Sequence, residues 1–180
     1  MRLGVEAALV GTEIVPGDVE VVDDVITGYG LSSPIGRGLA APGLVDLQVN
    51  GFAGVDLMGA DAESYRRVGE AVLETGVTAY LPTFISAPEA DLVAALRAVP
   101  IETDGPRILG AHLEGPFISK ARLGIHPASA HRDPDPALLE RLLAAGPVRV
   151  VTLAPELPGA GELIDLLLER IAALGRPPGQ

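Results

Sequence analysis

The pattern of apolar and polar positions changes near Pro42. Residues 1–41 carry short apolar and polar alternations that glycines interrupt, a pattern typical of short β-strands. From Pro42 onward, short apolar runs alternate with longer segments of helical periodicity, which predicts a strand and a helix four times in succession. We therefore expect a small β-layer over residues 1–41, an α/β unit over residues 42–175 and a tail over residues 176–180.

The four predicted strands are apolar runs that end in glycine or polar residues, and they cover residues 43–51, 77–84, 107–115 and 148–156. The four predicted helices cover residues 61–76, 86–99, 135–146 and 161–175, and the first three have capping residues at their first positions. Asp61 and Asp135 stand where N-caps are expected, and Ser86 with Glu89 has the spacing of a capping box.

The order of elements favours parallel strands joined by right-handed crossovers. An α/β barrel and a doubly wound sheet both fit this order, and both place a ligand at the carboxyl ends of the strands. Polar residues lie at or just beyond these ends, namely Asn50, Thr83, Glu114 and Glu156. Residues 42–175 are about half of the roughly 250 residues of a whole barrel. An open half-barrel would expose strand edges and its apolar inner face, so we expect that the sheet closes differently, that a partner covers it or that the chain is part of something larger.

Charge and composition exclude several classes of function. The net charge is −11 and Lys120 is the only lysine, so we expect neither nucleic acid nor an anionic membrane as a partner. The chain has no cysteine, which excludes disulfides and thiolate metal sites and is compatible with a reducing compartment. No signal peptide and no run of eighteen apolar residues are evident, and we expect a cytoplasmic protein.

The stretch Gly110–Phe117, GAHLEGPF, ends an apolar run with two ionisable residues. His112 and Glu114 are two positions apart on a predicted strand, so their side chains share a face. Glu114 could be a metal ligand or an acid–base group, or it could cap a helix or pair with Arg122. For His112 alone, a hydrogen-bonded core histidine is favoured over a ligand.

A long irregular loop follows Gly115-Pro116 and carries the other two histidines. His126 could reach back over the end of the strand, or it could be a surface histidine. For His131 the surface interpretation is favoured.

Three polar residues alternate with apolar ones in the first predicted strand, namely Asp46, Gln48 and Asn50. They share one face, which could line a barrel interior or face solvent on an edge strand. Gly51 and Gly54 follow at once and could let the backbone approach a ligand closely.

Four stretches together resemble the N-acetylglucosamine-6-phosphate deacetylases of the amidohydrolase superfamily. They are APGLVDLQVNGFAGVD, GAHLEGPFIS, GIHP and VTLAPE, in this order. The resemblance covers about residues 1–168 and only the N-terminal half of the family's enzymes. It implies the N-terminal half of an (α/β)8 barrel, with about four βα units, preceded by part of a small β-domain at residues 1–41.

The resemblance also implies a reaction and a cofactor. The reaction is hydrolysis of the acetamide of N-acetylglucosamine 6-phosphate to glucosamine 6-phosphate and acetate, with one divalent metal ion per site, zinc or iron. Glu114 matches the family's metal-binding glutamate, while Ile125 and His126 match a loop pair that contacts substrate.

Further site residues follow from the same resemblance. Gln48 and Asn50 stand where the superfamily often has two metal-binding histidines, which matches the branch that uses a single metal ion. Gly51 and His112 are further possible site-lining residues.

The family's other metal-binding histidines and its acid–base aspartate lie beyond residue 180. We therefore expect no catalytic residue in this chain, an incompletely ligated metal ion and no activity of the chain alone. The expected partners are an amino-sugar phosphate and either a missing C-terminal half or a second copy of the chain. The alternatives are a non-catalytic binding or assembly module and, less favoured, a small enzyme whose site is Glu114, His112 and His126.

Overall fold

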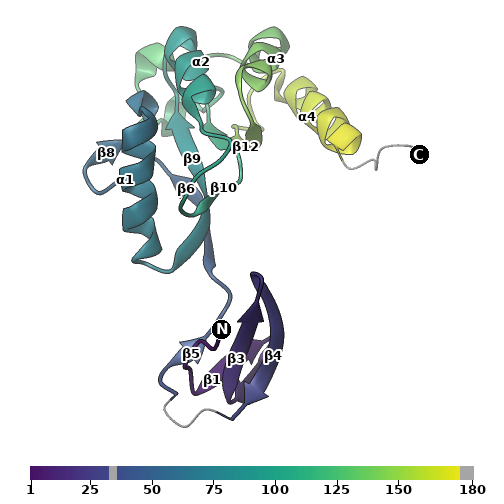
Figure 1. The fold of residues 1–180 in the computed structure, drawn as a ribbon. Helices are drawn as coiled ribbons and strands as arrows, with labels where there is room; N and C mark the ends of the chain where they lie inside the picture. Colours follow the sequence, from purple (N-terminus) through teal and green to yellow (C-terminus); the bar gives the residue numbers. More distant parts are fainter. Residues whose placement is uncertain (33–35, 175–180) are drawn as a thin grey trace. The chain divides into compact units, whose positions relative to one another are not determined.

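The chain folds into two compact units, Met1–Gly43 and Leu44–Gln180 (Figure 1). The computed structural model describes residues 1–32 and 36–174. The predicted tail at residues 176–180 and Gly175, where the fourth predicted helix ends, lie outside the described residues. No helix of the described chain is both long enough and apolar enough to cross a membrane.

The first unit is built from short strands, namely β1 (Ala7–Val10), β2 (Glu13–Pro16), β3 (Asp18–Val22), β4 (Val25–Leu31) and β5 (Leu39–Ala40). Strand β1 pairs antiparallel with β2 and parallel with β5, while β3 and β4 form an antiparallel pair. The Asp18 carboxylate accepts hydrogen bonds from the backbone N–H groups of Gly4, Val5 and Val19. Burial of Asp18 opposes ionisation, but these bonds outweigh it and hold the pKa of Asp18 below its ordinary value.

One sheet of five strands forms the centre of the second unit. The strands are β6 (Leu44–Val49), β9 (Val77–Ile85), β10 (Arg107–Ile108), β11 (Ala111–Glu114) and β12 (Val148–Thr152). Strand β9 pairs with β6, β10 and β11, and β11 pairs with β12. Every one of these pairs is parallel, which confirms the predicted α/β class with a parallel sheet.

Four α-helices connect or follow these strands, namely α1 (Ala62–Leu73), α2 (Glu89–Ala98), α3 (Pro136–Ala145) and α4 (Ala160–Leu174). The two predicted aspartate caps are confirmed, because Asp61 accepts the N–H of Ser64 and Asp135 accepts those of Ala137 and Leu138. Shorter elements complete the unit, namely β7 (Gly51–Phe52), β8 (Val55–Asp56) and three 3-10 turns at η1 (Leu57–Gly59), η2 (Lys120–Arg122) and η3 (Ala128–Ala130).

The predicted capping box of the second helix is wrong. Helix α2 begins at Glu89 with Pro88 in the cap position, and no side chain caps it. Ser86 lies before the helix, and its hydroxyl contacts the ring of His126 instead. A partner forty positions away therefore replaces the local bond that the spacing predicts.

The helices cover one face of the sheet. Tyr80 and Phe84 of β9 and Leu113 of β11 belong to a buried cluster that also contains helix residues, among them Val68, Leu92, Leu96, Leu139 and Leu163. Because side chains alternate along a strand, Thr83, His112 and Glu114 lie on the opposite face. The apolar core therefore leaves a polar face free for a site.

The third predicted strand is interrupted. It covers residues 107–115 in the sequence, but the structure divides it into β10 and β11 at Leu109 and Gly110. The N–H of Leu109 still bonds to Tyr80 in β9, whereas the N–H of Ala111 bonds to Pro147 before β12. Gly110 has φ +131°, and a Cβ there would overlap the Pro147 carbonyl oxygen, so glycine permits this change of partner.

Strand β6 leaves apolar side chains open to solvent. Leu44, Val45 and Leu47 are 61%, 54% and 57% exposed, and β6 has a single strand neighbour, β9, within the described residues. Strand β6 is therefore an open edge of the sheet within the described residues.

Candidate active site

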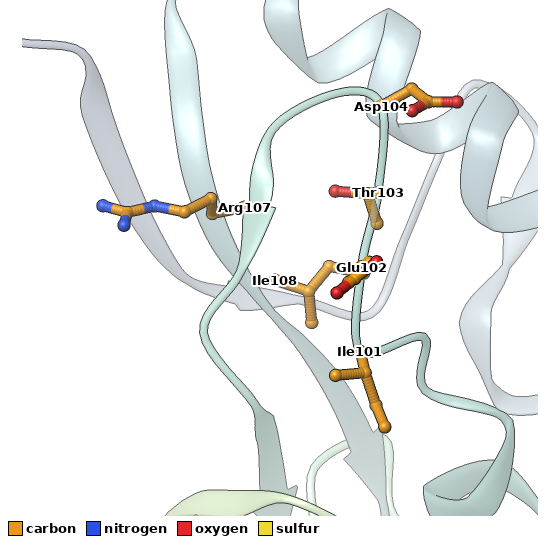
Figure 2. Close-up of a pocket in the computed structure, with 6 residues that line it drawn as sticks. All are labelled: Ile101, Glu102, Thr103, Asp104, Arg107 and Ile108. Atoms are coloured by element: carbon orange, nitrogen blue, oxygen red, sulfur yellow. The ribbon is translucent and has the colours of Figure 1, made fainter. Parts of the chain in front are cut away.

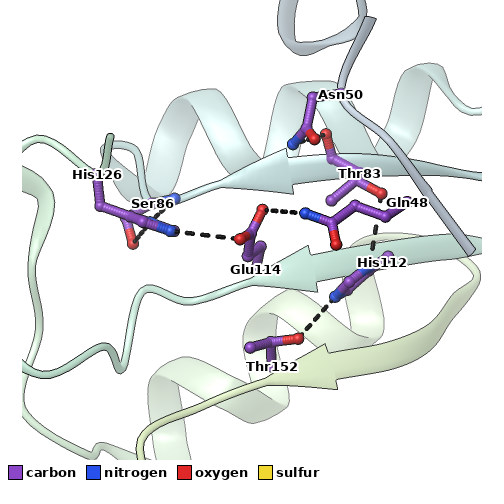
Figure 3. Close-up of polar contacts among 8 residues, drawn as sticks. All are labelled: Gln48, Asn50, Thr83, Ser86, His112, Glu114, His126 and Thr152. Carbon is purple, nitrogen blue, oxygen red and sulfur yellow. Dashed lines mark hydrogen bonds and ion pairs between the residues drawn. The ribbon is translucent and has the colours of Figure 1, made fainter. Parts of the chain in front are cut away.

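The carboxyl ends of the parallel strands bring polar residues together at one edge of the sheet. Asn50 follows β6, Ser86 follows β9, Glu114 ends β11 and Thr152 ends β12. Figure 3 shows two neighbouring sets of polar contacts. Gln48, Glu114, His126 and Ser86 form one set, and Asn50, Thr83, His112 and Thr152 form the other. Five of the predicted site residues, Gln48, Asn50, His112, Glu114 and His126, therefore make direct polar contacts at this edge.

Glu114 is held between two side chains. Gln48 Nε2 donates a hydrogen bond to Glu114 Oε2 at 3.1 Å, and His126 Nε2 lies 3.7 Å from Glu114 Oε1 (Figure 3). The Glu114 side chain is 21% exposed, so its carboxylate remains accessible from solvent. The sequence left open that Glu114 caps a helix or pairs with Arg122. Within the described residues, the side chain of Glu114 makes neither contact.

His126 reaches back over the strand ends and is buried. Its Nδ1 accepts a hydrogen bond from the Ser86 backbone N–H at 3.2 Å and lies 2.8 Å from Ser86 Oγ. Because a backbone N–H can only donate, Nδ1 carries no proton and the ring proton is on Nε2, the atom that faces Glu114. The alternative of a surface histidine is wrong, since loop folding places 91% of the residue surface out of contact with water.

His112 has both ring nitrogens occupied. Nδ1 lies 3.0 Å from the Leu47 carbonyl oxygen, to which it must donate, and Nε2 lies 2.8 Å from Thr152 Oγ1, from which it accepts. Thr83 Oγ1 donates to the Leu81 carbonyl oxygen and lies 3.5 Å from His112 Nδ1. This geometry is that of a hydrogen-bonded core histidine, the interpretation favoured for His112 from the sequence.

A hollow of about 600 Å³ adjoins this polar group. Asn50 and Ser86 line it, as does Ile125, whose side chain is 76% exposed. Gly51 also lines the hollow, and a Cβ at Gly51 would overlap the Val55 carbonyl oxygen in the β7–β8 pair. The close pairing of β7 with β8 thus accounts for this glycine.

His131 is buried, with 9% of its surface exposed, so the surface interpretation favoured for it is wrong. It follows η3, in the part of the loop that returns toward α3, and packing there removes it from solvent. Its Nε2 lies 4.0 Å from Asp133 Oδ1 and has no hydrogen-bond partner within the described residues.

The described residues do not make up a complete metal site. Glu114 offers a carboxylate, and His126 is the histidine beside it. Across residues 1–32 and 36–174, no three His, Asp or Glu side chains gather closely enough to hold a metal ion. Catalytic zinc sites normally have three protein ligands, so further ligands would have to come from elsewhere.

A second hollow, of about 470 Å³, lies at the other end of the sheet (Figure 2). The residues that line it are Ile101, Glu102, Thr103, Asp104, Arg107 and Ile108. They precede or begin β10, and the side chains of Asp104 and Arg107 point away from each other in Figure 2. This hollow gathers no converging charged groups and is not the candidate site.

Ser86 and Thr152 take part in these contacts, but the sequence did not predict them as site residues. Ser86 follows the carboxyl end of β9, which is the signal that identified Asn50 after β6. Its capping-box spacing directed the interpretation to the helix instead. Thr152 ends β12, but the predicted strand extended four residues further to Glu156, so the residue lay inside the expected strand.

Comparison with known sequences identifies relatives of one enzyme class. No protein-family model matches the sequence. An N-acetylglucosamine-6-phosphate deacetylase of Homo sapiens is 38% identical over 145 residues, which span 75% of this chain and 36% of that protein. An N-acetylgalactosamine-6-phosphate deacetylase of Escherichia coli O157:H7 is 35% identical over 138 residues, which span 73% of this chain and 37% of that protein.

Solved structures of the same enzyme class share the fold. The N-acetyl-D-glucosamine-6-phosphate deacetylase of Mycobacterium smegmatis matches with a TM-score of 0.82 and 31% identity, over 94% of this chain and 47% of that one. The Thermotoga maritima enzyme matches with a TM-score of 0.79 and 29% identity, over 93% and 46%. The chain therefore spans about a third of the curated relatives and about half of the solved chains.

Proposed function

The chain resembles the N-terminal part of N-acetylglucosamine-6-phosphate deacetylases in sequence and in fold, and we propose that it supplies this part of such an enzyme. The reaction is hydrolysis of the acetamide of N-acetylglucosamine 6-phosphate, which gives glucosamine 6-phosphate and acetate. The observation that carries the proposal is the position of Glu114, a solvent-accessible carboxylate at the carboxyl edge of a sheet that matches deacetylase structures.

We assign the parallel sheet to the first four strands of an (α/β)8 barrel, counting β10 and β11 as one interrupted strand. Strands that follow one another in the chain pair in parallel, and helices cover one face of the sheet. A segment of an α/β barrel has this arrangement. The apolar side chains exposed on β6 are a surface that further strands and helices would cover. The occupant we propose is the C-terminal half of the enzyme, and a second copy of the chain is the alternative.

Glu114 supplies one ligand of a single divalent metal ion, zinc or iron. Its carboxylate has the oxygen donors that such an ion accepts, and Gln48 fixes one of the two oxygens by a hydrogen bond. A metal ion bound there would polarise the acetamide carbonyl and activate a water molecule. The other ligands and the acid–base group come from outside the chain, so the chain alone is inactive.

Loop residues of this chain contact the substrate. His126 presents Nε2–H at the strand ends, where it can donate to a substrate oxygen, and Ile125 offers an exposed apolar side chain at the rim of the hollow. Asn50 and Gly51 form part of the wall of that hollow, while His112 stabilises the sheet beneath through Leu47 and Thr152.

The proposed location is the cytoplasm, which a chain without cysteine supports because its stability does not depend on disulfides. The contacts of the site offer no specific support for the alternative of a non-catalytic binding module.

A joined protein tests the function directly. Residues 1–174 would be fused to the C-terminal part of the Mycobacterium smegmatis enzyme, and acetate release from N-acetylglucosamine 6-phosphate would be measured. We expect release by the joined protein and none by either part alone. A joined protein that folds and binds metal but releases no acetate would refute the proposal.

A further inference from the structure

We propose that Ser86 is a positioning residue that fixes the imidazole of His126 with its Nε2–H directed toward Glu114. The proposal deepens the proposed function and rests on it, because it assumes that Glu114 and His126 act in the same site. Its geometry is independent of any bound metal or substrate.

Two donors of Ser86 converge on one ring nitrogen. The residue is 2% exposed, and its backbone N–H and hydroxyl lie 3.2 Å and 2.8 Å from His126 Nδ1. The backbone N–H has no other chemical role than donation, so Nδ1 must be the acceptor. A proton on Nδ1 would point at that N–H, and Nε2 would then present a lone pair to the Glu114 carboxylate.

Gly115 provides the space that the Ser86 hydroxyl needs. A Cβ at Gly115 would overlap Ser86 Oγ and lie 2.9 Å from Ile118 Cγ1, and φ at Gly115 is +92°. Gly115 directly follows Glu114, so the chain beside the carboxylate is shaped around the serine that holds the histidine. Ser86, which directly follows β9, thus packs against the residue next to Glu114 and also contacts His126.

His112 provides an internal reference, because its contacts require the opposite tautomer. The Leu47 carbonyl oxygen accepts from His112 Nδ1, so the proton of His112 is on Nδ1 and that of His126 is on Nε2. The two tautomers can be distinguished in one spectrum of the chain, which contains only three histidines.

The first test is the nitrogen-15 spectrum of the histidine rings in the 180-residue chain, recorded at alkaline pH and assigned with His112→Gln and His131→Gln. We expect the His126 proton on Nε2 and the His112 proton on Nδ1. A His126 proton on Nδ1 would overturn the proposal without any variant of Ser86.

The second test removes the hydroxyl. In Ser86→Ala we expect the population ratio of the Nε2–H tautomer of His126 to its Nδ1–H tautomer to fall by about fivefold. This is the factor that one ordinary hydrogen bond is worth. Ser119→Ala, which alters a serine without a side-chain cap bond on the loop that carries His126, should leave the ratio unchanged. An unchanged ratio in Ser86→Ala, with the His112 signals intact, contradicts the proposal.

If the His112 signals show that Ser86→Ala does not fold, Ser86→Cys replaces it, because a thiol is similar in shape and a weaker donor. A lower ratio in Ser86→Cys supports the proposal and an unchanged ratio contradicts it. The spectra need neither metal nor substrate, so they separate this proposal from the proposed function. The spectra report the tautomers whether or not the joined protein releases acetate, and acetate release tests the reaction whichever nitrogen of His126 carries the proton.

Discussion

At the scale of single residues, Glu114 and His126 depend on partners that are distant in the chain. Gln48 lies 66 positions before Glu114, and Ser86 lies 40 positions before His126. Both partners belong to strands β6 and β9 or follow them directly. The site is therefore assembled by the pairing of parallel strands and by the return of one loop.

The close packing at Gly115 gives a prediction about stability. Gly115→Ala should destabilise the second unit by about 2–4 kcal/mol, because the new Cβ meets Ser86 and Ile118 and because φ is positive. Chemical denaturation of the purified chain measures this change.

Gly124→Ala is the matched control. Gly124 also has a positive φ, +59°, but nothing lies within 4 Å of the position of its Cβ. It should lose only about 1 kcal/mol, from backbone strain. Equal losses in the two variants would show that Ser86 does not limit the space at Gly115.

Residue-level prediction succeeded where the interaction is local. Asp61 and Asp135 cap helices through N–H groups two or three residues away, so their sequence neighbours suffice to predict the bond. Ser86 also has the sequence spacing of a helix cap, but in the folded chain its hydroxyl contacts Nδ1 of His126 instead. That choice depends on where a loop forty residues later returns, which no local pattern encodes.

At the scale of elements, helices α2 and α3 are joined by a bidentate ion pair. Arg141 Nε and Nη2 lie 2.6 Å and 3.1 Å from the two carboxylate oxygens of Glu89. The hydrogen bonds from Arg141 hold the pKa of Glu89 below its ordinary value of about 4.5.

Arg141→Gln should raise the pKa of Glu89 toward that ordinary value, and a carbon-13 titration of the carboxyl groups measures it. Because the folded pKa is the lower one, the pair stabilises the fold above the ordinary pKa and this contribution is lost as the pH falls through the folded pKa. The wild type should therefore lose more stability on acidification than Arg141→Gln does.

Arg97→Gln is the control, since Arg97 is an exposed arginine of α2 with no ion pair in the part of the chain that the structure describes. It should leave the Glu89 titration unchanged. A Glu89 titration unchanged in Arg141→Gln as well would mean that the ion pair is absent in solution.

Element order was predictable because each helix and strand has its own periodicity. The parallel sheet follows from the alternation of the two patterns, whereas the break at Gly110 does not. The apolar run there is continuous, and the interruption comes from a change of strand partner across a glycine with positive φ. Such a change is a property of the assembled sheet.

At the scale of the whole molecule, the open edge at β6 governs how the isolated chain behaves. Exposed strand edges with apolar side chains favour association between chains. We expect the isolated chain to elute in size-exclusion chromatography with a mass above its 18.5 kDa, and the double variant Val45→Lys with Leu47→Lys to shift toward monomer.

Ile101→Lys serves as the control for this prediction. Ile101 is 94% exposed but lies in a loop, so its replacement removes apolar surface without altering a strand edge. A wild-type chain that is monomeric at high concentration would contradict the account of β6 as an uncovered edge.

The most direct test of the central claim is acetate release by the joined protein that carries Glu114→Gln. Loss of a residue that hydrogen-bonds to a metal ligand typically lowers metal affinity or activity by about 10–100-fold. Loss of a metal ligand itself should have a larger effect, so we expect the rate of acetate release to fall by more than about 100-fold. Glu140→Gln, which alters an exposed glutamate of helix α3, should leave the rate within about twofold under the same assay, since surface changes are worth about 0.5 kcal/mol or less. Acetate release by Glu114→Gln at the rate of Glu140→Gln would contradict the assignment of Glu114 to the reacting centre.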